Sequence, residues 1–81
     1  MRLLLSILSS LLLFPGISFA LDKTEIRDII EQAHPGAEIS EIEKETYRGE
    51  KIWEVDFRHE DRKLEAIISL DGEIIKVQID D

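Results

Sequence analysis

Apolar residues between positions 21 and 34 recur with the spacing of one face of a helix. The members of this face are Ile26, Ile29, Ile30 and Ala33. Because residues at i, i+3, i+4 and i+7 lie on the same side of a helix, the segment is predicted to form one amphipathic helix. Asp22 is placed to cap its first turn, and Glu25 would complete a capping box. The helix is expected to end at Pro35-Gly36, because proline disfavours helical geometry at the residue before it.

From residue 37 onward, apolar and polar positions alternate as they do in β-strands. The clearest run is Trp53-Glu54-Val55-Asp56-Phe57, and further alternating runs cover residues 64–70 and 74–79. Turn-forming segments separate the runs at 48–51, 59–62 and 71–72. Asp71-Gly72 is typical of a two-residue hairpin turn in which both central residues have positive φ. The pattern therefore predicts an antiparallel meander.

The lengths of the two later loops predict how these strands pair. A four-residue loop at 59–62 gives the pairs Phe57 with Leu64, Val55 with Ala66, and Trp53 with Ile68. A two-residue loop at 71–72 gives the pairs Ile68 with Ile75, Ala66 with Val77, and Leu64 with Ile79. Both registers place the apolar residues of three strands on one face, and a slip of one residue would expose them.

The first strand, over roughly residues 37–48, is specified less strongly. Ile39 and Ile42 have opposite parity, so both face the core only if a bulge lies between them at Ser40-Glu41. The strand is expected at an edge of the sheet, with its far end partly solvated.

The turn after this strand leaves two registers open. A two-residue loop at Gly49-Glu50 turns Ile42, Lys44 and Thr46 toward the core but sets Glu43 opposite Asp56 and Glu45 opposite Glu54. Like charges directly opposite each other are destabilising. A three-residue loop avoids these pairs but turns Glu43 and Glu45 toward the core. In either case the predicted fold is α+β, with one N-terminal helix packed on a four-stranded antiparallel meander sheet.

Residues 1–20 have the layout of a secretory signal peptide. Arg2 precedes an apolar run, a Pro-Gly pair breaks that run, and small residues follow at Ser18 and Ala20. Cleavage is predicted between Ala20 and Leu21. An uncleaved membrane anchor is the rival interpretation, but the Pro-Gly pair interrupts the run before it reaches full spanning length. We expect one domain over residues 21–81, exported to the periplasm or the external medium and without membrane attachment after cleavage.

Composition narrows the classes of partner. The chain has 18 acidic residues against 10 Lys and Arg, which argues against nucleic acids and anionic lipid surfaces as partners. It has no cysteine, so disulfides and lipid attachment to a cysteine are excluded. A domain this small must then be stabilised by a well-packed core, by a protein partner or by self-association as a homodimer.

The run Ala33-His34-Pro35-Gly36-Ala37 and the later W-E-V-D-F and D-G-E-I segments together resemble the PepSY domain family. The residues that carry the resemblance are Pro35, Gly36, Ala37, Ile39, Gly49, Trp53, Glu54, Val55, Asp56, Phe57, Asp71, Gly72 and Ile74. Trp53 occupies a position where tyrosine is more usual. The resemblance implies a non-catalytic protein-binding module, since PepSY domains are associated with inhibiting thermolysin-type metalloproteases. It offers no catalytic residues that could be transferred to this chain.

The residues themselves also predict no enzyme, cofactor or metal site. His34 and His59 are the only histidines, and no HExxH motif or i, i+4 histidine pair accompanies them. His34 is interpreted as a helix-end residue and His59 as a solvated turn residue. The acids Glu54, Asp56 and Glu65 are interpreted as a solvated face. The alternative is a sensor that uses this acidic face, together with Glu60 and Asp61, for a cation or a cationic ligand.

A protein-docking surface is the functional site that the strand pattern predicts. Ile52, Ile67 and Ile74 have the parity of the sheet face away from the helix, and Tyr47 joins them in one of the two registers of the first strand. We expect this face, or the free edge of the first strand, to bind a protein partner, and the resemblance suggests an envelope or secreted peptidase restrained by the binding.

Overall fold

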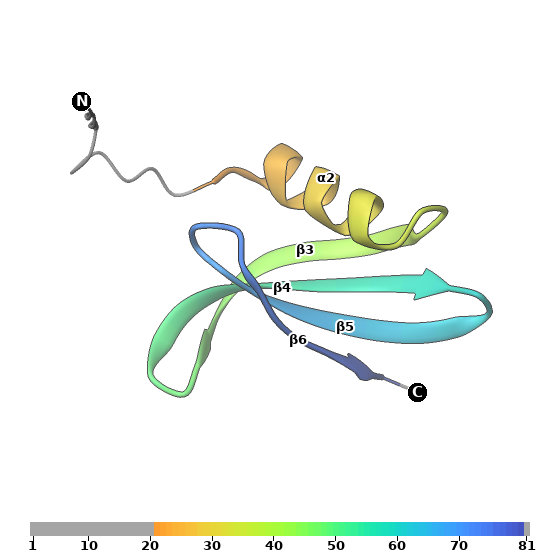
Figure 1. The fold of residues 1–81 in the computed structure, drawn as a ribbon. Helices are drawn as coiled ribbons and strands as arrows, with labels where there is room; N and C mark the ends of the chain where they lie inside the picture. Colours follow the sequence, from red (N-terminus) through yellow and green to blue (C-terminus); the bar gives the residue numbers. More distant parts are fainter. Residues whose placement is uncertain (1–20, 81) are drawn as a thin grey trace, which may run out of the picture.

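The computed structural model describes residues 21–80, which form one helix followed by a four-stranded antiparallel sheet (Figure 1). Helix α2 spans Lys23–Ala33, and the strands are β3 (Glu38–Tyr47), β4 (Glu50–His59), β5 (Arg62–Ser69) and β6 (Ile74–Ile79). The strands lie in the order β3-β4-β5-β6, so each pairs with its neighbour in the chain. The predicted α+β meander is confirmed. The predicted signal peptide lies outside the described residues.

Helix α2 begins with the capping box that the sequence predicts. The Glu25 backbone N–H donates to Asp22 Oδ1 at 2.9 Å, and the Asp22 N–H donates to Glu25 Oε1 at 2.9 Å. Two of the backbone donors left free at a helix start are thereby satisfied. At the other end the His34 N–H donates to the Ile30 carbonyl at 2.8 Å, and Gly36 reverses the chain with φ of 90°.

The apolar face of α2 is packed against the sheet. Ile26 and Ile30 are fully buried and Ile29 is half-buried, whereas Ala33 is exposed, although the pattern placed it on the same face. The buried core that these residues join consists of Ile26, Ile30, Ile42, Trp53, Val55, Phe57, Ala66 and Ile68. These residues come from the helix and from β3, β4 and β5. The core therefore lies under one helix and across three of the four strands.

The β4–β5 hairpin has the predicted register. Phe57 pairs with Leu64, Val55 with Ala66, and Trp53 with Ile68. The strands continue to a His59–Arg62 pair, so the connecting turn consists of Glu60 and Asp61, with φ of 54° and 67°. Two successive residues with positive φ define the twisted two-residue turn that the sequence placed at Asp71-Gly72.

The β5–β6 hairpin differs from the prediction at its turn. The Ser69 carbonyl accepts from the Gly72 N–H at 3.0 Å, and the Ser69 N–H donates to the Glu73 carbonyl at 2.8 Å. Only Gly72 has positive φ in this loop, at 99°, which gives a three-residue loop with a glycine in the left-handed position. Leu64 still pairs with Ile79 and Ala66 with Val77, but a register shift pairs Ile68 with Ile74. The predicted Ile68–Ile75 pair was wrong.

The chain before α2 is also fixed at this loop. The Leu21 N–H donates to the Leu70 carbonyl at 3.1 Å, and a methyl group added at Gly72 would lie 2.8 Å from Leu21 Cδ1. Gly72 is therefore favoured by its backbone conformation, and any larger residue there would also displace the Leu21 side chain. The predicted first residue of the exported chain is thus an ordered part of the domain.

Strand β3 is an edge strand with the predicted bulge. Ile39 pairs with Phe57 and Ile42 with Val55, and the register shifts between Ile39 and Glu41. The turn is Arg48-Gly49, with φ of 52° and 84°, so neither register left open by the sequence is the observed one. The observed register places Glu41 opposite Asp56 and Glu43 opposite Glu54, so two like-charge pairs remain.

Strand β6 is the other edge, and the helix does not cover it. Val77 and Ile79 were predicted to face the core, but they are 36% and 53% exposed. An α-helix is only about 10 Å wide with its side chains, and strands lie about 4.8 Å apart, so one helix shields about two or three strands. Parity determines the sheet face on which Val77 and Ile79 lie, but the width of the helix determines how far they are buried.

The turn at Glu60-Asp61 is a site where a substitution is expected to stabilise the fold. Glu60 has φ of 54°, a conformation that costs most residues about 1 kcal/mol and that asparagine adopts more readily. Glu60→Asn should therefore raise the free energy of unfolding by roughly 0.5–1 kcal/mol. Urea unfolding followed by Trp53 fluorescence measures the change.

The matched control is Glu73→Asn, which removes the same charge at a residue without positive φ. Equal effects of the two substitutions would contradict the assignment of this turn.

Candidate functional site

The sheet face opposite α2, called the outer face below, is where the sequence places the docking residues. Ile52 and Ile67 lie on it, but they are only 2% and 4% exposed. Ile52 pairs with Glu45 and Ser69, and Ile67 pairs with Glu54 and Lys76, so polar residues flank both isoleucines. Their predicted exposure was therefore wrong. They form the floor of this face and not its contact surface.

A hollow opens beside this floor, where the β3–β4 turn approaches β6. It has a volume of about 440 Å³ and is lined by Tyr47, Arg48, Glu50, Ile52, Ile75 and Lys76. We call these six residues the outer hollow. The Arg48 guanidinium carbon lies 5.3 Å from the centre of the Tyr47 ring, so the wall carries a cation–π contact. Two of the predicted docking residues, Tyr47 and Ile52, are thus brought together.

Ile74 is the predicted docking residue that the structure places elsewhere. It packs against the buried core, whereas Ile75 lines the outer hollow and is 49% exposed. The register shift in β6 exchanges the roles of these two neighbours, because one extra residue moves a side chain from one face of a sheet to the other. The assignment of Ile74 to the outer face was therefore wrong. The loop geometry that causes the shift was not evident in the sequence.

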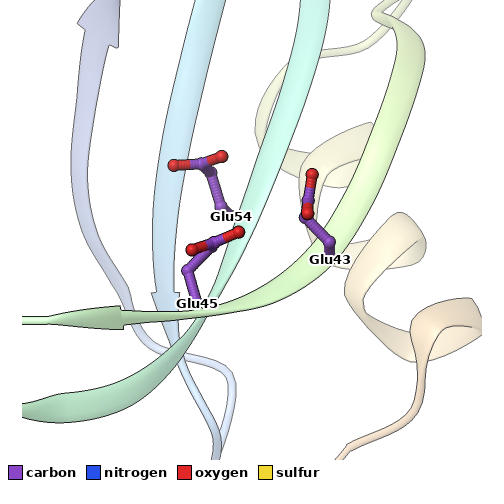
Figure 2. A group of neighbouring side chains, drawn as sticks. All are labelled: Glu43, Glu45 and Glu54. Atoms are coloured by element: carbon purple, nitrogen blue, oxygen red, sulfur yellow. The ribbon is translucent and has the colours of Figure 1, made fainter.

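An acidic cluster adjoins the outer hollow. Carboxylate oxygens of Glu43, Glu45 and Glu54 lie within 4.8 Å of one another, and a second such group consists of Glu54, Asp56 and Glu65. Figure 2 shows the first group on the outer face, with the helix on the far side of the strands. Glu54 belongs to both groups, so the five residues form one cluster. The sequence grouped Glu54, Asp56 and Glu65 on a solvated face, but all three are half-buried. The positions of Glu43 and Glu45 stayed open, because the side to which they point depends on the register of β3.

Crowding changes the protonation of this cluster. The pKa of Glu54 is raised from its ordinary value to about 7, mainly by its hydrogen bond to Glu65 and then by burial and by the charges of Glu65, Asp56 and Glu45. The pKa of Glu65 is lowered, because it accepts this hydrogen bond and another from Gln78 Nε2 at 2.6 Å. Glu54 is therefore partly protonated near neutral pH, and its proton is donated in a hydrogen bond to the ionised Glu65.

Two flanking acids have raised pKa values as well. Burial raises the pKa of Asp56, and the charge of Glu65 adds to the effect. The Oδ1 atom of Asp56 is buried and receives no hydrogen bond from any described residue. The pKa of Glu43 is raised, first by its hydrogen bond to Glu41 and by that residue's charge. The hydrogen bonds within the cluster therefore do not offset the repulsion between its carboxylates.

Glu60 and Asp61 do not belong to this cluster. They form the β4–β5 turn and line a separate hollow of about 180 Å³ with Gly36, Glu38, Arg58 and His59. The sequence suggested a cation site that combines these two acids with Glu54, Asp56 and Glu65. The structure does not bring the two sets of residues together.

The two histidines meet at the end of the sheet near the Pro35 corner. Their ring centres lie 5.4 Å apart, and the His34 ring lies 5.2 Å from that of Phe57. His59 Nε2 lies 3.0 Å from the Pro35 carbonyl oxygen, a hydrogen bond that joins β4 to the helix corner. His34 is the helix C-cap as predicted, but His59 is half-buried and bonded, not a solvated turn residue. Their sequence separation gave no signal of this contact.

Carboxylates make up the groups of potential metal ligands found in residues 21–80. The groups of three or more potential ligands in this range are the two carboxylate groups of the acidic cluster, and neither includes a histidine. Carboxylate oxygens suit hard cations such as Ca²⁺.

Comparisons with protein families, with curated proteins and with solved structures gave no match to this chain. The resemblance to PepSY domains therefore stays a prediction. Among residues 21–80, no helix has the length and apolar character needed to cross a membrane.

The protonation of Glu54 predicts how stability depends on pH. The pKa of Glu54 rises from 4.5 to about 7 on folding, so its contribution is complete below pH 4.5 and is lost as the pH rises through 7. Glu54→Gln keeps a donor for Glu65 without this titration. The variant should be more stable than the parent at pH 8 by on the order of 1 kcal/mol, after allowance for solvent screening, and equally stable near pH 5.

Urea unfolding at pH 5, 6.5 and 8 measures this difference. Glu31→Gln is the control, because it removes an exposed helix charge and should leave the pH dependence of the parent unchanged. Parallel pH profiles for Glu54→Gln and the parent would exclude this protonation of Glu54.

Proposed function

We propose that this protein is an exported, non-catalytic module that binds another protein and restrains a peptidase in the envelope or in the secreted space. The observation that carries the proposal is the outer hollow, an open cavity on a sheet face that no described helix covers. Its apolar wall includes Ile75, which is half-exposed, and its floor includes the buried Ile52. Export is supported by the composition of residues 1–20, and the peptidase by the resemblance to PepSY domains.

The exposed apolar residues on β6 support a binding role. The large apolar side chains with the greatest exposure among the described residues are Ile75, Val77 and Ile79. All three belong to one edge strand, whereas the other edge strand, β3, is rich in glutamate. Edge strands with exposed apolar residues tend to pair or to bind unless they are protected. A partner that binds at the outer hollow would bury Ile75. Val77 and Ile79 lie on the helix side of the sheet, opposite Ala66 and Leu64, so they are left for a second partner, such as another copy of the chain paired along the β6 edge.

Inhibition of a peptidase tests the proposal. A protein of residues 21–81, which contains every described element, should inhibit a thermolysin-like peptidase of its own compartment in a concentration-dependent way. Mass spectrometry should show the inhibitor intact, so that competition by a second substrate is excluded. The control is Ile30→Asp, which places a charge in the fully buried core and should abolish both folding and inhibition.

If the intact protein affects no such peptidase, the inhibitory function is wrong. If the folded and unfolded proteins inhibit equally, the effect does not come from this fold.

A second candidate function is the binding of a divalent cation by the acidic cluster. The supporting observations are the two carboxylate groups within 4.8 Å and the buried Asp56 Oδ1 atom without a hydrogen-bond partner among residues 21–80. Such oxygens are the ligands that Ca²⁺ prefers. Because Glu54, with its pKa of about 7, must lose its proton to act as a ligand, binding should be stronger at pH 8 than at pH 5.5.

Calcium titration followed by NMR tests this function. At pH 8 the amides of Glu54, Asp56 and Glu65 should shift together, and Glu54→Gln should weaken binding by about tenfold because one ligand loses its charge. Glu60→Gln is the control, since Glu60 lies in the separate β4–β5 turn. Shifts centred on Glu60 and Asp61 would place the cation elsewhere, and absence of any shift would exclude this function for calcium.

A further inference from the structure

We propose that the outer face binds an extended segment of a partner protein that carries one large apolar side chain followed, two residues later, by Lys or Arg. The apolar side chain enters the outer hollow, and the cationic side chain lies over the acidic cluster. This inference rests on the proposed protein-binding function and names the chemistry of the segment that is bound.

The outer hollow is large enough to take up a large apolar side chain, and part of its wall is apolar. Its volume of about 440 Å³ is in the lower part of the range of roughly 300–1,000 Å³ found for ligand pockets. Ile52 closes the floor at 2% exposure, whereas Ile75 on the wall is 49% exposed and has apolar surface left to bury. The charged groups Arg48, Glu50 and Lys76 lie around the opening, where they keep contact with water. A side chain that enters would therefore meet carbon atoms below and a polar rim above.

The spacing along β4 sets the position of the cation. Ile52, Glu54 and Asp56 are successive residues on the same face of β4, so each lies about 6.4–6.8 Å from the next. An extended ligand that runs along β4 has the same two-residue repeat. If its apolar side chain is above Ile52, its next side chain on that face is above Glu54. The partner segment is thus expected to carry its cation at the second residue after the apolar one, and a further cation at the fourth would reach Asp56.

The charge on both sides of this path favours a cation at that position. On β3, Glu45 is opposite Ile52 and Glu43 is opposite Glu54, so carboxylates flank the path. On β5, a carboxylate oxygen of Glu65 lies within 4.8 Å of those of Glu54 and Asp56. The basic residues of this face lie around the acidic cluster. Lys76 is in the same cross-strand row as Glu54 but on β6, beyond Ile67, and Arg48 borders the hollow. Arg58 pairs with Lys63 beside the β4–β5 turn. The centre of the outer face is therefore acidic, and a Lys or Arg side chain placed there would be attracted to several carboxylates at once.

Direct binding of a synthetic peptide tests this inference. The probe is an eight-residue peptide with one phenylalanine and with lysines at the second and fourth residues after it, titrated into residues 21–81 by calorimetry and by NMR. A second peptide has the same composition but carries its lysines at the first and third residues. In an extended chain those lysines point away from the acidic cluster, so the second peptide should bind about tenfold more weakly.

Two isoleucines of one strand give a matched pair of variants. Ile75→Ser removes the apolar wall of the hollow and should lower affinity for the first peptide about tenfold. Ile79→Ser changes the same type of side chain on the same strand at a similar exposure of 53%, outside the hollow, and should leave affinity within about twofold. Because both side chains are exposed, neither substitution should prevent folding, which circular dichroism verifies.

The acidic half of the site has its own pair of variants. Glu45→Gln combined with Glu54→Gln should lower affinity and remove the preference for the first peptide over the second. Glu31→Gln combined with Glu60→Gln replaces the same number of carboxyl groups elsewhere and should preserve that preference.

Three outcomes would overturn the inference. They are equal binding of the two peptides, equal effects of Ile75→Ser and Ile79→Ser, and a change of oligomeric state in Ile75→Ser by light scattering, which would make a second copy the occupant. If the protein inhibits its peptidase while neither peptide binds, the proposed function holds and this inference alone fails. If the first peptide binds as expected and no peptidase is affected, the site is correct and the inhibitory function is wrong.

Discussion

The fold depends on the burial of one apolar sheet face under a single helix of 11 residues. Ile26 and Ile30 supply the fully buried contacts of that helix, and β3, β4 and β5 supply the opposing side chains. The chain has no disulfide that could add to this core. Because the helix is too narrow to cover a fourth strand, Val77 and Ile79 remain exposed. Strand β6 is thus uncovered because a single helix packs on the sheet, and its exposed apolar residues give the protein a surface that a partner can bury.

On the outer face, the burial of two isoleucines is opposed by repulsion between neighbouring acidic side chains. Parity places Ile52 and Ile67 on a face without a helix, and long polar side chains of neighbouring strands bury them instead. Many of those neighbours are acidic, so repulsion accompanies the burial. The proton that Glu54 holds toward Glu65 relieves part of the repulsion near neutral pH. A bound cation, whether a metal ion or a side chain of a partner, would relieve it in another way. The same crowding therefore explains both the raised pKa of Glu54 and the suitability of the face for positive charge.

The parts of the fold that the sequence predicts are those set by local rules. The capping box at Asp22 and Glu25 and the bulge between Ile39 and Ile42 follow from residue type and parity. The pairing of β4 with β5 follows from the requirement that apolar residues share one face. The turns were harder to predict, because the residues that adopt positive φ in pairs are Arg48 with Gly49 and Glu60 with Asp61, not Asp71 with Gly72. Strand pairing imposes that geometry even where the side chains do not favour it.

Parity placed some residues of the candidate site correctly and others not. Tyr47 and Ile52 were assigned to the outer face from parity and do line the outer hollow. The exchange of Ile74 for Ile75 arises from a single irregularity in β6, and a one-residue shift has no signature in an alternating pattern that is apolar at both positions. The contact between His34 and His59 was also inaccessible, because it depends on how the ends of α2 and β4 meet in space.

The binding surface depends on the division between the two sheet faces, and the neighbouring residues Ile74 and Ile75 report on it. Methyl NOE spectroscopy of residues 21–81 measures which side chains each isoleucine contacts. Contacts are expected from Ile74 to the core under the helix and from Ile75 to Tyr47 or Ile52 in the outer hollow. Contacts from Ile75 to the core, with Ile74 beside Tyr47, would show that β6 has no register shift, and the outer hollow described here would not exist.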